Sequence, residues 1–212
     1  MTDTIAGIAI PDTKIASDAT ELVRETTNEL IFNHSRRVFI FGSLQARALG
    51  AKPDPELLYV AAMFHDLGLV APYRSSDQRF ELDGADQARA FLAAHDFSAA
   101  DGDLVWAAIA LHTTPEVPTR MHPVIASTTA GVETDVLGMH LYRISDVELA
   151  EVTSAHPRPD FKRRILEAFY DGFSHRTDST FGTVNADVLE HFDPTFRHTN
   201  FVDVINNSDW TE

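Results

Sequence analysis

The segment AAMFHDLGLV, residues 61–70, places two ionisable side chains inside an otherwise apolar run. His65 and Asp66 are neighbours at a point where the surrounding apolar residues predict a buried helix. Burying two such groups costs free energy unless something compensates for their lost hydration. A divalent cation would do so while using both side chains as ligands. The alternative is a histidine bonded to a carboxylate within an ordinary core.

The residues before this pair predict a short, buried helix that ends at the pair. Asp54 suits the N-cap, Pro55 suits the first helical position, and Gly68 suits the position just past the apolar face. Neighbouring side chains on a helix diverge by about 100°. Near a helix end, however, a long histidine and a short aspartate can converge on one ion.

Apolar residues at helical spacing also occur over most of the chain. Residues 18–49 are expected to form one helix or a helix pair, with Asp18 as N-cap and Gly50 as the stop. Further helices are predicted at residues 84–95, 101–112, about 122–131, 145–154, 160–174 and 185–191. No alternating apolar and polar run is long enough for a convincing sheet, so the predicted class is all-α.

The length and composition suit a single domain. The chain has 212 residues, of which 44% are hydrophobic, enough to bury one core. Loops rich in Pro, Ser, Thr and Asp are expected at residues 71–83 and 113–121. We expect an N-terminal extension at residues 1–17, one domain at residues 18–191, and an irregular C-terminal segment at residues 192–212 that packs on the domain or trails it.

The charge balance excludes several classes of partner. The chain carries 32 acidic and 17 basic residues and a net charge of −15, and no stretch gathers enough Lys or Arg to bind nucleic acid or an anionic membrane. No secretory leader or long apolar window is present, so we expect a soluble, cytoplasmic protein. The absence of cysteine removes thiol nucleophiles, disulfides and thiolate metal ligands.

Two further polar residues fall into a recognisable order with the pair. His34 precedes it in FNHSRRVFIFG, and Asp135 follows it in TTAGVETDVLG. This H…HD…D order resembles the HD-domain superfamily of metal-dependent, all-helical proteins. Within that superfamily the chain is similar to the cyanamide hydratase branch over about residues 30–140. The similar segments are NHSRRVFIFG, LLYVAAMFHDLGL, FELDGADQARAFL, VWAAIALHT and TAGVETDVLG.

The resemblance implies an HD-domain helical bundle with one divalent transition metal. Its ligands would be His34, His65, Asp66 and Asp135. Zinc is the metal that the resemblance favours, while two imidazoles and two carboxylates also suit iron or manganese. Glu133 is a carboxylate close to Asp135, and a solvated acid in a helix-end turn is the alternative reading of Asp135.

The resemblance also implies two proton-moving residues, Glu81 and His112. His112 would face the pocket as a hydrogen-bonding or proton-relay group, or bind a second metal; alternatively, it only complements a helix dipole. Glu81 is favoured over Asp83 as a carboxylate over the site, and the alternative is an acidic turn. No catalytic role is assigned to Arg36 and Arg37, which are expected on a solvated face or in ion pairs. Seven histidines are expected to be surface or structural residues: His95, His122, His140, His156, His175, His191 and His198.

The activity implied is hydration of a small C≡N compound, such as cyanamide to urea. A metal lowers the pKa of bound water, and Glu81 or His112 would supply a proton to the nitrogen. The pocket walls are expected to be large and apolar, which suits a small neutral substrate. The candidate wall residues are Phe32, Met63, Trp106 and Leu111.

Two other functions are compatible with the same motif. An HD-type phosphohydrolase of nucleotides or phosphate esters would hold phosphate with basic residues, although the chain has no Gly-rich phosphate loop. Its candidate residues are Arg36, Arg37, Arg74, Arg79 and Arg120. A metal-stabilised binding module is the non-enzymatic alternative. Similar proteins suggest a homodimer, for which apolar surface near residues 161–173 would serve.

Overall fold

The computed structural model of the chain describes residues 3–210, and these residues are mostly helical. The helices are α1 (Lys14–Thr26), α2 (Glu29–Leu49), α3 (Pro55–Phe64), α4 (Phe80–Ala94), α5 (Ala99–Ala110), α6 (Pro123–Val132), α7 (Asp146–Ala155), α8 (Phe161–Phe173), α9 (Asn185–Phe192) and α10 (Phe201–Asn206). The only sheet in the described part is an antiparallel pairing of β1 (Thr4–Ile5) with β2 (Ile8–Ala9). The all-α class is confirmed.

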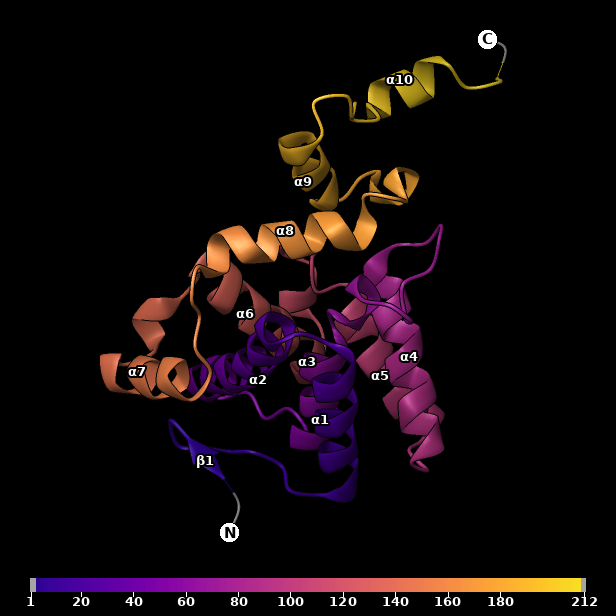
Figure 1. Cartoon of the computed structure of the whole chain (residues 1–212). Coiled ribbons are helices and arrows are strands. Elements are labelled where there is room, and N and C mark those ends of the chain that lie inside the picture. Colours follow the sequence, from indigo (N-terminus) through magenta and orange to yellow (C-terminus); the bar gives the residue numbers. More distant parts are fainter. Residues whose placement is uncertain (1–2, 211–212) are drawn as a thin grey trace.

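The helices form a bundle around α3. This helix contacts α1, α2, α5 and α6, while α4 lies along α5 and α2 lies along α6. In Figure 1, α8 crosses one end of the bundle, and α9 and α10 lead away from it toward the C-terminus. No helix between residues 3 and 210 combines the length and apolar character needed to cross a membrane.

The central helix α3 is buried on all sides. Every residue from Leu57 to Phe64 is buried. As predicted, Asp54 is the N-cap: its side chain accepts hydrogen bonds from the backbone N–H groups of Glu56 and Leu57, both at 3.0 Å, and Pro55 follows it. The helix ends at Phe64, so the His-Asp pair occupies the turn beyond it.

Gly68 does not act as the predicted helix stop. It lies inside a 3₁₀ turn, η1 (Leu67–Leu69), that follows the His-Asp pair. A Cβ atom at this position would lie 2.1 Å from the backbone oxygen of Phe80, at the start of α4. Glycine is therefore required here for close approach of two backbones.

A second close approach joins α2 to α6. A Cβ atom on Gly131 would lie 2.2 Å from the backbone oxygen of Val38, and one on Gly42 would lie 2.4 Å from that of Ser127. The two helices therefore touch through their backbones. This contact sets the position of the π turn η3 (Glu133–Leu137), which continues α6 beside α2.

The predicted N-cap at Asp18 is wrong. The first helix begins four residues earlier, at Lys14, and the side chain of Asp18 pairs instead with Lys14 at 2.6 Å and with His95 at 2.8 Å. The predicted helix or helix pair at residues 18–49 is a pair, because a second N-cap intervenes. Asn28 accepts from the backbone N–H of Ile31 at 3.0 Å and opens α2.

All helices predicted beyond residue 83 are present, as α4 to α9. The expected loop at residues 71–83 is shorter than predicted, because α4 begins at Phe80 and includes Glu81 and Asp83. The C-terminal segment predicted to be irregular contains the short helix α10, which exposes its apolar residues. The predicted domain boundaries stay a prediction.

Candidate metal centre

Three buried side chains, one from α2 and two from the turn after α3, bring their ligand atoms together. His34 lies on α2, while His65 and Asp66 follow α3, and all three are 0% exposed. The two Nε2 atoms of His34 and His65 lie 3.1 Å apart. Oδ2 of Asp66 lies 3.5 Å from Nε2 of His34 and 3.3 Å from Nε2 of His65. These three residues form a group whose ligand atoms lie within 4.8 Å of one another.

Hydrogen bonds on the far side of each ring fix the orientation of both histidines. Nδ1 of His65 lies 2.7 Å from the backbone oxygen of Ala62, and Nδ1 of His34 lies 2.6 Å from Oδ2 of Asp135. Each Nδ1–H therefore donates to an oxygen, which leaves the Nε2 lone pair free. Two lone pairs that face each other beside a carboxylate suit a cation between them.

Asp66 supplies the strongest evidence that a cation fits. Both of its carboxylate oxygens are buried and accept no hydrogen bond from any residue in the described part of the chain. Such groups are rare because burial removes their hydration without replacement. Burial alone would raise the pKa of Asp66, but the neighbouring imidazoles of His65 and His34 hold it well below its usual range. A divalent transition metal would satisfy both oxygens.

Asp135 lies behind His34 rather than among the three ligand residues. Besides the bond from His34, its carboxylate accepts two bonds of 2.8 Å from Arg37 and one of 3.0 Å from Arg158. Burial would raise its pKa, but His34 and Arg37 hold it below its usual range. The structure therefore does not group Asp135 with the other three predicted ligands; its carboxylate contacts the opposite side of the His34 ring, and its role as a fourth ligand stays a prediction.

Arg37 is a site residue that sequence analysis missed. Its side chain is 0% exposed and also donates to the backbone oxygens of His156 and Pro157, at 3.1 and 3.0 Å. The only signal in the sequence was its place three residues after His34, which puts both on one face of α2. His156, which was expected to be a surface or structural histidine, is buried beside this group.

His112 faces the same site from the turn that follows α5. Its Nε2 lies 3.8 Å from Oδ1 of Asp66, and its ring contacts that of His65 edge-on, with centroids 4.9 Å apart. Nδ1 lies 2.6 Å from the backbone oxygen of Ile109, so Nε2 is the atom presented to the site. Burial and the nearby charge of His65 lower the pKa of His112 to about 4, which keeps the ring neutral near pH 7.

Comparison with known families places these residues in context. Residues 31–153 match the HD domain, and this span is more than half of the chain. It contains the residues of the candidate site named so far, except His156, Pro157 and Arg158. The chain belongs to the HD domain family. No curated protein matches it. Membership of the HD domain family indicates a metal-dependent hydrolase or phosphohydrolase superfamily, whose members bind divalent metals. In this HD protein the corresponding candidate metal site is the group of His34, His65 and Asp66.

Glu81 does not lie over the site as predicted. It is fully buried, but its carboxylate accepts hydrogen bonds from Arg79 at 2.9 Å, Thr113 at 2.5 Å and Asn185 at 3.1 Å. Burial would raise its pKa, but Arg79 and His112 lower it. In this HD protein the carboxylate of Glu81 already accepts several hydrogen bonds and connects α4 to Asn185 of α9 and to Thr113. Sequence analysis could not foresee partners so distant along the chain.

A pocket of about 410 Å³, here called the metal pocket, opens onto the candidate metal ligands. Apart from Asp66, its charged lining residues are the carboxylates Glu116 and Glu133, and no Lys or Arg is among the described residues that line it. Its apolar lining residues are Val132, Val136, Leu137, Met139, Phe169 and Val184. The expected walls were wrong, because Phe32, Met63, Trp106 and Leu111 do not line it. Met63 belongs to the hydrophobic core, and Phe32 and Trp106 pack against that core.

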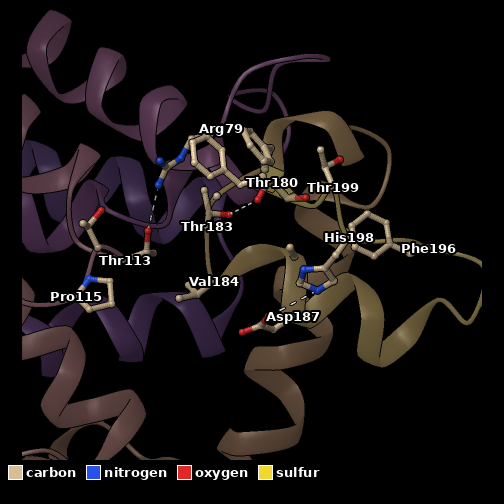
Figure 2. A pocket seen from close by; sticks show the side chains of 15 residues that line it. Arg79, Thr113, Pro115, Thr180, Thr183, Val184, Asp187, Phe196, His198 and Thr199 are labelled. Atoms are coloured by element: carbon tan, nitrogen blue, oxygen red, sulfur yellow. Dashed lines mark hydrogen bonds and ion pairs between the residues drawn. The ribbon is translucent and has the colours of Figure 1, made fainter. Parts of the chain in front are cut away.

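A second cavity, of about 570 Å³, adjoins this pocket. The two share the lining residues Thr113, Thr114, Pro115 and Val184. Figure 2 shows Arg79 and Thr113 on one side of the second cavity, facing threonines and His198 from the C-terminal part of the chain. A molecule held at the candidate metal ligands therefore has neighbouring space whose lining comes mostly from residues 180–201, beyond the HD match.

Proposed function

We propose that this HD protein is a metal-dependent hydratase that adds water to a small neutral C≡N compound, such as cyanamide. The observation that carries the proposal is the lining of the metal pocket, which is apolar and contains the carboxylates Glu116 and Glu133 but no described Lys or Arg. A phosphate ester would meet these two negative charges, and no described basic side chain lines the pocket to help the metal hold it. A small neutral molecule has no such cost. The similarity of five sequence segments to cyanamide hydratases also supports this choice.

The residues of the site suit the addition of water. A divalent metal held by His34, His65 and Asp66 would supply a water of lowered pKa, and we propose zinc. Adding water to C≡N forms a C–O bond and transfers one proton to nitrogen, which gives an imidic acid (an isourea from cyanamide). Moving the remaining hydroxyl proton to the same nitrogen then gives the amide, which is urea for cyanamide. His112 presents a neutral Nε2 to the site, so it can take a proton at that atom and return it to the substrate nitrogen. The apolar walls exclude other water.

The second candidate is a phosphohydrolase. One observation favours it: Arg79 lines the cavity next to the metal pocket, where a guanidinium could contact a phosphate. Arg79, however, already pairs with Glu81 at 2.9 Å. The pair adds little net charge to the cavity, so we rank this function second.

The two functions are separated by a substrate panel. Protein loaded in turn with zinc, iron or manganese would be assayed with cyanamide, small nitriles, isonitriles, mononucleotides and simple phosphate esters. We expect urea from cyanamide and no release of phosphate. Brisk hydrolysis of nucleotides without urea formation would overturn the hydratase proposal.

A further inference from the structure

The metal pocket contains one carboxylate that is partly buried and has no bonding partner. Glu133 opens the π turn η3 and lines the pocket between the apolar residues Val132 and Val136. No side chain between residues 3 and 210 donates a hydrogen bond to its carboxylate, and burial and the nearby charge of His140 are the influences that act on it. Its acceptor capacity is therefore available to a molecule in the pocket.

Two buried carboxylates near the pocket, Asp135 and Glu81, differ from Glu133 in this respect, while Asp66 belongs to the candidate metal ligands. Asp135 receives bonds from His34, Arg37 and Arg158, and Glu81 receives three bonds from its own neighbours. A partly desolvated carboxylate without a donor loses hydration that nothing replaces. A ligand that brings an N–H group would restore the lost interaction, whereas a ligand with only acceptor atoms would be repelled.

We propose that Glu133 is the specificity-determining residue of the pocket and accepts a hydrogen bond from an N–H group of the substrate. This inference rests on the proposed hydratase function and narrows its substrate class. The preferred substrates carry at least one N–H on the nitrogen bonded to the C≡N carbon. Cyanamide has this group, while N,N-dimethylcyanamide keeps the same C≡N bond and lacks it.

The test compares these two molecules on metal-loaded wild-type protein and on Glu133→Met, Glu133→Gln and Glu116→Gln. Methionine preserves size and removes the acceptor, while glutamine keeps an acceptor oxygen without the charge. Glu116 is an exposed carboxylate of the same lining and provides the matched control. Kinetics would give kcat and KM, calorimetry would give binding, and elemental analysis would check that each variant retains its metal.

For cyanamide, we expect Glu133→Met to lower kcat/KM about ten- to a hundredfold, mainly through KM, as loss of a hydrogen bond to a charged group predicts. For N,N-dimethylcyanamide, the kcat/KM of Glu133→Met should stay within about threefold of the wild-type value, since that molecule has no N–H group to donate to Glu133. The kcat/KM of Glu133→Gln for cyanamide should lie between the values of wild type and Glu133→Met. Glu116→Gln should leave the ratio of the two substrates unchanged.

The outcomes separate this inference from the proposed function. An unchanged substrate ratio in a metal-replete Glu133→Met variant overturns the role of Glu133 and leaves the hydratase function standing. Binding of cyanamide that depends on Glu133 but yields no urea overturns the reaction and supports the N–H contact. Wild-type protein that neither binds nor converts cyanamide overturns both.

Discussion

Oδ2 of Asp135 lies 2.6 Å from Nδ1 of His34, on the side of the ring opposite the Nε2 atom that faces His65. A carboxylate in this position fixes the tautomer of a ligating histidine and makes its Nε2 a better donor to a metal. Arg37 and Arg158 hold the same carboxylate in place. Asp135 would thus act on a bound cation through the ring of His34 rather than by direct contact.

Asp135→Asn should weaken metal binding by about 10–100-fold without abolishing it, because the residue supports a ligand. It should also lower the free energy of unfolding by about 3–5 kcal/mol, because Arg37 would stay buried without its charged partner. Metal competition titrations and urea denaturation would measure the two effects. Asp160→Asn, which removes a surface pair with Arg163, is the control. Failure of Asp135→Asn to bind metal even at saturation would restore Asp135 as a fourth ligand.

His65→Ala and Asp66→Ala should each remove the metal, which we expect at about one per chain in wild-type protein. The reason is that these two residues and His34 are the ones whose ligand atoms converge. Elemental analysis after dialysis would measure the content. His95→Ala, which affects a histidine paired with Asp18 near the surface, should retain it. Full occupancy in both ligand variants would show that the metal binds elsewhere.

Glu81→Gln and His112→Ala should have different consequences, because only His112 reaches the pocket. His112→Ala should keep the metal and lose about 10²–10⁴-fold in turnover, as expected for a proton relay. Glu81→Gln should reduce activity far less and lower stability by about 1–3 kcal/mol, through its bonds to Arg79 and Thr113. Turnover numbers and thermal unfolding would be compared. An equally large loss of turnover in Glu81→Gln would make Glu81 a catalytic residue after all.

His156→Gln should make the protein less sensitive to acid. Burial and the charges of Arg36 and Arg37 lower the pKa of His156 to about 4 from 6.5. The unfolded chain therefore binds this proton more readily, so the contribution is fully present above pH 6.5 and is lost as the pH falls toward 4. Glutamine can still accept from Arg36. Denaturation at several pH values should show a shallower fall in stability for the variant than for wild type; parallel curves would contradict this account.

Gly131→Ala should destabilise the bundle by about 1–3 kcal/mol, the usual range for overpacking. Its Cβ would lie 2.2 Å from the backbone oxygen of Val38, so α6 would have to move away from α2. Gly102→Ala is the matched control, because its Cβ would meet only the flexible side chain of Arg89. Equal stability of the two variants in urea denaturation would show that the helices tolerate separation.

Local signals made much of this fold predictable from the sequence. The N-cap at Asp54 with Pro55 and the helical spacing of apolar residues act over a few neighbours, so α3 and the later helices could be predicted. His34, His65 and Asp66 could be assigned to one site from the sequence, because their order follows a recognisable motif. Asn28 was missed as a cap because apolar spacing continues across it from α1 into α2.

The remainder depended on contacts between residues far apart in the chain. Arg37 pairs with Asp135, and Glu81 bonds to Asn185, a residue of α9, rather than lining the pocket. The pocket walls were wrong for the same reason: Phe169 and Val184, which line the pocket, belong to the region that carried no motif. No local pattern reveals which distant side chain will neutralise a buried charge.

The number of residues in the π turn η3 is critical for the candidate site. A π turn contains one residue more than an α-helical turn, and here the backbone N–H of Gly138 reaches back to the oxygen of Glu133. A gene that lost the codon of Thr134 would encode an ordinary α-helical turn, and the side chains after the deletion would rotate by about 100°. The carboxylate of Asp135 would then turn away from His34, although every residue of the candidate site would still be encoded. A loop absorbs such a loss by changing its path, but this turn cannot, so single-codon deletions should be tolerated far less here than in the loops of the same protein.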